Sequence, residues 1–253
     1  MAPSSEKAAT PRKAAALLVL SGNRVLMVKR PNHLSYPGAF VFPGGTVSPS
    51  DPSIMYTALR ETFEETGLLL STTPVHPGRR RFLATVQKQV HSGELSFDEA
   101  LEALDVSLIP TGDLVPFSVW TTPHGPPKRY ETHFLVTRLP AHLSEEAAVG
   151  DGGIEVVGTH WLPVERIPAW IREGRTRMHS AQIYLTSRLA WAGGWDGVLE
   201  VARDIGGTEV LMRRTVEDGR RVENLPNGDK VVYEAGEGSA GKAWVELTDR
   251  ARL

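Results

Sequence analysis

The side chains best suited to chemistry are three glutamates at helical spacing, Glu61, Glu64 and Glu65. At about 100° per residue, positions i, i+3 and i+4 share one face of a helix, so the three carboxylates lie close together. Like charges at this spacing repel each other and cost a bare helix stability. A hard divalent cation such as Mg²⁺ or Mn²⁺ reverses that cost, because it prefers oxygen ligands. The cluster therefore indicates a metal site, and a solvent-exposed acidic helix is the alternative.

A double glycine and an arginine accompany the glutamates. Gly44 and Gly45 follow a short apolar run, and a glycine backbone approaches a metal or phosphate where a Cβ would interfere. Arg60 lies one turn before Glu64 and can orient its carboxylate. A metal held here would neutralise a diphosphate and lower the pKa of a bound water for attack on phosphorus. The chain contains no cysteine, which excludes a thiol nucleophile and a thiolate zinc site.

The glutamates need a helix to hold them, and the sequence predicts one over residues 51–66. Asp51 followed by Pro52 is typical of a helix start with Asp51 as the N-cap, and Gly67 suits the position just past the end. Five residues share an arc that would face the core: Met55, Leu59, Thr62, Phe63 and Thr66. The glutamates occupy a different arc.

The remaining pattern interleaves strands and helices, which predicts an α/β fold with a mixed sheet covered by helices. A capping box at Ser96–Glu99 opens one of the helices. We expect strands at 15–20, 24–29, 39–42, 68–70, 114–120, 132–136, 155–161, 209–215 and 230–234. We expect further helices at 82–90, 97–104, 164–172 and 178–192.

These motifs together resemble the Nudix box, written G-x5-E-x7-R-E-U-x-E-E-x-G-U with U aliphatic. The chain matches at Gly45, Arg60, Glu61, Glu64, Glu65, Gly67 and Leu68. It departs at Asp51, which stands in the first glutamate position with eight residues before Arg60, and at Thr62, which fills an aliphatic position. The resemblance implies a Nudix-type α/β/α sandwich and a hydrolase for diphosphate linkages that uses Mg²⁺ or Mn²⁺.

A second set of residues is similar to the Nudix branch that includes peroxisomal coenzyme A diphosphatases. It comprises Trp120, Thr122-Pro123, Arg129-Tyr130, Thr132 and Phe134, followed by Glu155 and Trp161. The likeness extends over about residues 14–189. It implies cleavage of coenzyme A or its acyl esters to 3′,5′-ADP and a phosphopantetheine. ADP-ribose, a dinucleotide, a diphosphoinositol phosphate and an RNA cap are alternative substrates, and a non-catalytic Nudix binding or regulatory domain is the alternative of another class.

The resemblance implies a role for each site residue. Glu64 and Glu65 are metal ligands, Glu61 is a ligand or the general base, and the Gly45 carbonyl is a further ligand. Arg60 serves catalysis by orienting Glu64. Glu155 is an alternative base or a surface acid on an edge strand. Gly44, Arg129 and Tyr130 bind substrate, although an Arg-Tyr pair in a strand is equally consistent with a structural role.

Composition places these motifs in a soluble globular chain. The 253 residues carry a formal net charge of −2, which offers no field to draw nucleic acid or a membrane. We expect a flexible tail at 1–12, a Nudix domain at 13–195 with a helical insertion at about 79–106, and a β-rich extension at 196–253 packed on the same domain. The C-terminal Ala251-Arg252-Leu253 resembles a peroxisomal address read by an import receptor. The expected location is the peroxisomal matrix, with the cytoplasm as the alternative if Val245 and Leu247 anchor the tail as an edge strand.

Overall fold

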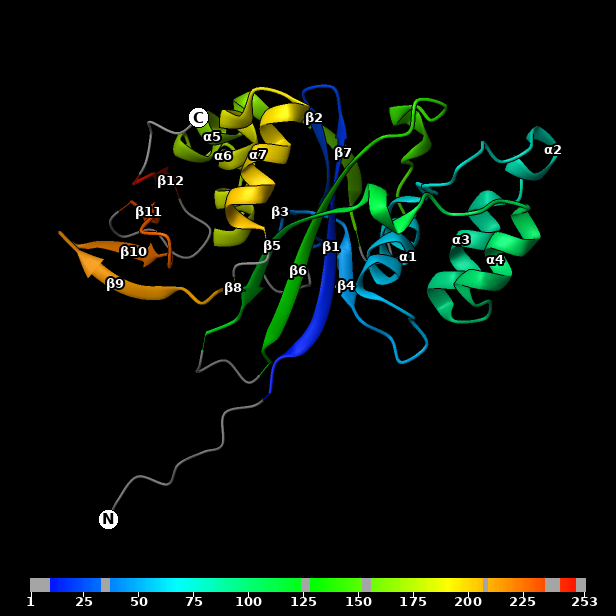
Figure 1. Cartoon of the computed structure of the whole chain (residues 1–253), viewed down its shortest axis with the longest axis horizontal. Helices are drawn as coiled ribbons and strands as arrows, with labels where there is room; N and C mark the ends of the chain where they lie inside the picture. The colour runs from blue at the N-terminus through cyan, green and yellow to red at the C-terminus, as the bar shows by residue number, and fades with distance from the viewer. Residues whose placement is uncertain are drawn as a thin grey trace, which may run out of the picture.

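The computed structural model describes residues 10–32, 37–123, 128–151, 156–206, 209–234 and 242–248. Helices cover both faces of a central sheet, and a smaller sheet lies beyond one layer of helices (Figure 1). None of the helices in these ranges has the length and hydropathy that a bilayer crossing requires.

In the described part of the chain, eight strands form the central sheet. Their order is β3-β2-β1-β6-β5-β8, with β4 paired to β1 and β7 paired to β2. The sheet is mixed, because β1 runs parallel to β6 and antiparallel to β2. The strands are β1 (Arg12–Ser21), β2 (Arg24–Lys29), β3 (Phe40–Val41), β4 (Gly44–Thr46), β5 (Val115–Thr121), β6 (Tyr130–Arg138), β7 (Gly158–Pro163) and β8 (Glu209–Val210).

The helices divide between the two faces of this sheet. Helices α1, α3 and α4 lie on one side, and α5, α6 and α7 lie on the other (Figure 1). The α-helices are α1 (Ile54–Thr66), α2 (Pro77–Arg80), α3 (Leu83–Ser92), α4 (Phe97–Leu104), α5 (Ile167–Arg172), α6 (Ser180–Ala192) and α7 (Trp195–Ile205). Short 3₁₀ turns occupy Thr111–Asp113, Glu145–Ala147 and Val164–Arg166. The expected α/β/α sandwich with a mixed sheet and a helical insertion is therefore confirmed.

Strand β1 shows how the sheet builds a core on each face. Alternate side chains of a strand point to opposite faces. Ala15, Leu17 and Val19 pack in the cluster that contains Phe63 of α1. Ala16, Leu18 and Leu20 belong to the cluster built with α6 and α7. Full burial of a side chain such as Phe63 contributes about 1.5–3 kcal/mol, so the core fixes α1 firmly against β1.

Beyond the central sheet, the described residues of the extension include a four-stranded antiparallel sheet. Its order is β12-β11-β10-β9, comprising β9 (Arg213–Glu217), β10 (Arg220–Asn224), β11 (Lys230–Tyr233) and β12 (Ala243–Glu246). Tyr233 and Val245 share the hydrophobic cluster of α6, so this sheet packs on the α6 side. Val245 pairs with Val231, which makes β12 an edge strand of the kind considered for the C-terminal segment.

The structure adds one helix that was not predicted and corrects three local predictions. The β-rich extension begins with helix α7, whose residues Val198, Val201, Ala202 and Ile205 are buried at helical spacing. No strand forms at 68–70: the Leu70 carbonyl accepts from the Ile109 N–H, and the next residue, Ser71, makes an isolated bridge to Leu108. The single strand expected at 209–215 is divided into β8 and β9. Arg12, placed at the end of the tail, begins β1, while residues 1–9 of that tail lie outside the described ranges.

Candidate functional site

Helix α1 begins two residues later than its sequence suggested. Ser53 is the N-cap, and its side chain accepts a hydrogen bond from the N–H of Tyr56. The prediction that Asp51 caps the helix is wrong, because its carboxylate is occupied elsewhere. Its Oδ2 accepts from the Ser48 N–H at 2.9 Å and from the Thr57 hydroxyl at 2.8 Å.

Arg60 joins the acidic residues into one network. Its Nε and Nη2 donate to the two carboxylate oxygens of Asp51 at 3.0 and 2.8 Å, a bidentate pair. Its Nη1 lies 2.8 Å from Oε1 of Glu64, and its Nη2 lies 3.0 Å from Oε1 of Glu61. The Asp51 side chain is only 1% exposed. Asp51, the residue that replaces the first glutamate of the box, is thus a buried carboxylate paired with Arg60, the arginine of the box.

Burial and pairing set the charge states of this network. Burial raises the pKa of Asp51, but hydrogen bonds from Arg60, the Ser48 N–H and Thr57 outweigh it and hold the pKa below its usual range. Burial likewise opposes the charge of Arg60, yet the bond to Asp51 and the charges of Glu61 and Glu64 raise the Arg60 pKa above its ordinary value. Asp51 and Arg60 are therefore both charged at neutral pH.

The two glycines lie where any side chain would collide. A Cβ on Gly44 would lie 2.2 Å from the Ala15 carbonyl oxygen, because β4 pairs closely with β1. A Cβ on Gly45 would lie 2.5 Å from the carboxylate of Glu61. The backbone of Gly45 thus borders the Glu61 carboxylate directly, which is the close approach that the sequence indicated.

Glu65 differs from the other two glutamates in its burial. It is 9% exposed although it shares their arc, and its Oε2 accepts from the Gly44 N–H at 3.0 Å. The bond ties the end of α1 to the glycine strand β4. Consequently the three carboxylates diverge: Glu61 and Glu64 face Arg60, and Glu65 faces Gly44.

The donors present suit a hard divalent cation. Carboxylate oxygens and a backbone carbonyl are the ligands that Mg²⁺ and Mn²⁺ prefer, and the space beside Gly45 is kept clear of a Cβ. Across the described ranges, however, the side chains of His, Asp and Glu do not gather in a group of three able to hold a metal. The residues fit the ion by donor type, with Glu61, Glu64, Glu65 and the Gly45 carbonyl as its candidate ligands.

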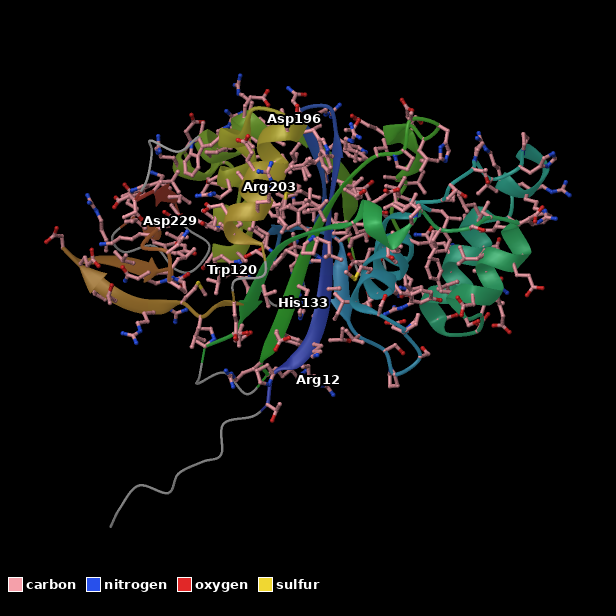
Figure 2. The ribbon with its side chains drawn as sticks, viewed as in Figure 1. Arg12, Trp120, His133, Asp196, Arg203 and Asp229 are labelled. Atoms are coloured by element: carbon pink, nitrogen blue, oxygen red, sulfur yellow. The ribbon has the colours of Figure 1, made fainter. Side chains whose placement is uncertain are left out.

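Two of the other predicted site residues, Arg129 and Tyr130, lie at the start of β6, which β1 separates from β4. The guanidinium Nε of Arg129, a side chain 8% exposed, donates to the Thr122 carbonyl at 3.0 Å, so it holds a loop. Tyr130 begins β6 opposite Arg12, the end of β1 labelled in Figure 2. Glu155 lies outside the described residues, so its prediction stays untested.

Two pairs of residues near the cluster were missed by sequence reasoning. His133, labelled in Figure 2, is paired with Ala15 on the side opposite Gly45, and its Nε2 lies 2.8 Å from Oε1 of Glu131. Two strand spacings of about 4.8 Å place it roughly 10 Å from Gly45 on the same sheet face. Gln87 and His91 of α3 meet α1 at Glu64. Only strand register and helix packing reveal these neighbours.

A cavity formed by the described residues is separate from the cluster. It measures about 930 Å³ and lies between the β1–β2 turn and the α6–α7 junction. Leu20, Arg138 and Trp195 line it, and the Arg138 guanidinium lies 5.0 Å from the Trp195 ring centroid. Leu20 is five residues beyond Ala15, the partner of Gly45, so about 17 Å of strand separates the two places.

Comparison with known proteins gives the family. A model of the NUDIX domain matches residues 10–183, more than half of the chain. A probable Nudix hydrolase of Schizosaccharomyces pombe is 53% identical over 49 residues, which are 19% of this chain and 17% of that protein. The matched segment is thus less than a fifth of the yeast relative. A crystal structure of a NUDIX hydrolase from Alicyclobacillus acidocaldarius aligns with a TM-score of 0.58 and 26% identity, covering 78% of this chain and 98% of that one. The chain therefore belongs to the Nudix hydrolase family.

Proposed function

We propose that this protein hydrolyses the diphosphate linkage of coenzyme A or acyl-coenzyme A in a reaction that depends on Mg²⁺ or Mn²⁺. The observation that carries the hydrolase assignment is the Arg60 network beside Gly44 and Gly45, inside a matching NUDIX domain. Within the family, the choice of coenzyme A rests on the sequence likeness around Trp120 and Arg129-Tyr130.

In the proposed reaction, a water oxygen attacks one phosphorus and the bridging P–O bond breaks. The water's proton passes to a general base, and the products are 3′,5′-ADP and 4′-phosphopantetheine or its acyl ester. A divalent ion, when bound, would supply positive charge to neutralise the diphosphate and would lower the pKa of the attacking water. Glu64, Glu65 and the Gly45 carbonyl are the proposed ligands, and Glu61 is a further ligand or the base.

The chain's own residues prepare this site before any ligand binds. Arg60 restrains Glu61 and Glu64 through two ion pairs. Asp51 in turn holds Arg60 through the two hydrogen bonds of their bidentate pair. The Gly44 N–H fixes Glu65. Such preorganisation holds the catalytic groups in a reactive geometry before the substrate binds. Positioning of this kind supplies a large share of the rate acceleration in phosphoryl transfer. A non-catalytic binding module could lose these glutamates freely, so the intact set favours an enzyme.

The experiment is a substrate panel. Purified protein is incubated with coenzyme A, dephospho-coenzyme A, ADP-ribose, a diadenosine compound, a diphosphoinositol phosphate and a capped RNA, each with Mg²⁺ and with Mn²⁺. We expect the highest kcat/KM for coenzyme A, with dephospho-coenzyme A poorer because it lacks the 3′-phosphate that an arginine can bind bidentately. Far more efficient turnover of any other diphosphate replaces the coenzyme A assignment. If the protein binds a compound of the panel but hydrolyses none of them, the result supports a non-catalytic domain.

We also propose that Ala251-Arg252-Leu253 directs the protein to peroxisomes through an import receptor. Where Leu253 is the free C-terminus, such a receptor would read it without insertion into the membrane. These residues lie outside the described ranges, whose last residue is Thr248, and the Thr248 N–H donates to Asp229. An N-terminal fluorescent fusion should give punctate fluorescence that becomes diffuse when the last three residues are removed. Because Val245 lies in the edge strand β12, diffuse fluorescence in both forms would indicate that this strand hides the signal, and would favour the cytoplasm.

A further inference from the structure

The C-terminal end of helix α1 is completed by Gly67 of the Nudix box and by two residues from outside the box. The last carbonyls of any helix lack partners within it and need them elsewhere. Here the Gly67 N–H donates to the Phe63 carbonyl at 2.8 Å, and the Gly150 N–H donates to the Thr66 carbonyl at 3.0 Å. The Glu64 carbonyl accepts from Nε2 of Gln87 at 2.9 Å.

Gln87 serves two segments with one amide group. The same Nε2 donates to the Gly150 carbonyl at 3.0 Å, so a single side chain joins α1 to the segment Ala148–Asp151. Gln87 is 4% exposed, and bonds this deeply buried are costly to lose. The packing around it is tight, because a Cβ on Gly67 would lie 3.1 Å from its Oε1.

Helix α3 approaches the Glu64 side chain as well. His91 is four residues beyond Gln87 and therefore on the same face of α3. Its Nδ1 lies 4.0 Å from Oε2 of Glu64. That nitrogen is buried, with no hydrogen-bond partner within the described structure. Helix α3 therefore contacts Glu64 through both its main chain and its carboxylate.

The segment that Gln87 holds is also tied at its other end. The Asp151 carboxylate is buried and accepts from the Val156 N–H at 3.0 Å. A loss of the Gln87 bonds would therefore release one defined connection, between Glu64 and Gly150. The Gly150–Thr66 bond, the Asp151–Val156 bond and the bond from the Thr159 hydroxyl to the Ala148 carbonyl would still restrain the segment.

We propose that Gln87 is a positioning residue, which fixes the Glu64 end of α1 against the segment Ala148–Asp151 and so sets the geometry of the proposed metal-binding carboxylate. This role rests on the proposed function in so far as Glu64 is a ligand. It also gives the helical insertion a structural role, because α3 braces the catalytic helix from the side away from β1.

The test compares Gln87→Met with Gln89→Met. The first variant keeps side-chain length and removes both donors, and the second makes the same change two residues along α3. Amide hydrogen exchange at Gly150 and steady-state kinetics are both measured well below the melting temperature of each variant. For Gln87→Met we expect faster exchange at Gly150 and a kcat lower by about 10–100-fold, the usual effect of losing a support to a metal ligand, with KM within two-fold. Gln89→Met should match the wild type in both.

The outcomes separate this proposal from the proposed function. A kcat for Gln87→Met within two-fold of Gln89→Met overturns the positioning role, even if exchange at Gly150 is faster. Should the wild type cleave no diphosphate in the panel, the proposed function fails, and exchange decides the connection alone: unchanged protection at Gly150 overturns it. If Gln87→Met does not fold, Gln87→Asn replaces it. That variant keeps a polar amide but withdraws it by one methylene, and the same loss of kcat is expected.

Discussion

The substitution Gly45→Ala isolates the contact between the glycine strand and Glu61. The added methyl would lie 2.5 Å from the Glu61 carboxylate, which must retreat by about 0.9 Å to reach the 3.4 Å of ordinary contact. Gly45 does not adopt a positive φ, so the backbone accepts alanine without strain. The perturbation therefore falls on the position of one carboxylate.

The expected effect is kinetic. A displacement of about 1 Å in a positioned group can cost about 100-fold in rate, or about 2.7 kcal/mol of transition-state stabilisation. Moving one partly buried side chain off its preferred rotamer costs only about 0.5–1.5 kcal/mol of folding free energy. We therefore expect kcat to fall by about two orders of magnitude with a small change in melting temperature.

Steady-state hydrolysis at saturating Mg²⁺ and thermal melts measure the two effects. Gly112→Ala is the matched control, because a Cβ there meets nothing within 4 Å. Gly44→Ala should lower both quantities: its Cβ overlaps the Ala15 carbonyl, so the β1–β4 pairing and the stability should suffer, and the Gly44 N–H that holds Glu65 would be displaced. If Gly45→Ala keeps a kcat within two-fold of Gly112→Ala, the Glu61 carboxylate is not part of the reactive geometry.

Three other predictions follow from the same network and its surroundings. Glu64→Gln and Glu65→Gln should each lower turnover by orders of magnitude while the protein stays folded, as circular dichroism would show; near-normal rates at saturating Mg²⁺ would contradict the site. Asp51→Asn weakens the bidentate pair with Arg60 and should lower the free energy of unfolding by about 1.5–3 kcal/mol, and an unchanged urea midpoint would rule this out. The pKa of His179 is lowered from its ordinary 6.5 to about 4, mainly by burial and further by the charges of Arg30 and Arg221. As the pH falls, the unfolded chain takes up the His179 proton before the folded chain does. The contribution to the free energy of unfolding is therefore full above pH 6.5 and is lost as pH falls toward 4, by about 2 kcal/mol between pH 7 and 5. The variant His179→Asn should remove that loss in urea titrations.

Local signals in the sequence were sufficient to predict the elements whose backbone hydrogen bonds are made with near neighbours in the chain. The capping box at Ser96 and Glu99 forms as predicted, and Gly67 adopts the left-handed conformation just past α1. Phe63 and Thr66 are buried on the expected face. Each of these depends on neighbours within four residues, which a sequence displays directly.

Tertiary contacts decided the features that the sequence did not reveal. Asp51 looked like an N-cap because aspartate at a helix start commonly caps, but Arg60, nine residues away, offers it a charged partner. Glu65 is buried although it lies on the polar arc, because Gly44 on another strand bonds it. Gln87 has no local signature at all, since both of its acceptors belong to other segments. Helix α7 was not predicted, because it contains Gly197 and glycine is a weak helix former.

The most direct test of the central claim follows the phosphorus atoms themselves. ³¹P spectra of coenzyme A and of ADP-ribose are recorded with the wild-type protein in Mg²⁺, with excess chelator, and with Glu64→Gln. The site described here predicts that the diphosphate resonances of at least one substrate are replaced by two phosphate monoester resonances, only with the wild-type protein in Mg²⁺. Equal cleavage in chelator, or by Glu64→Gln, would show that the box carboxylates and their metal do not perform the reaction.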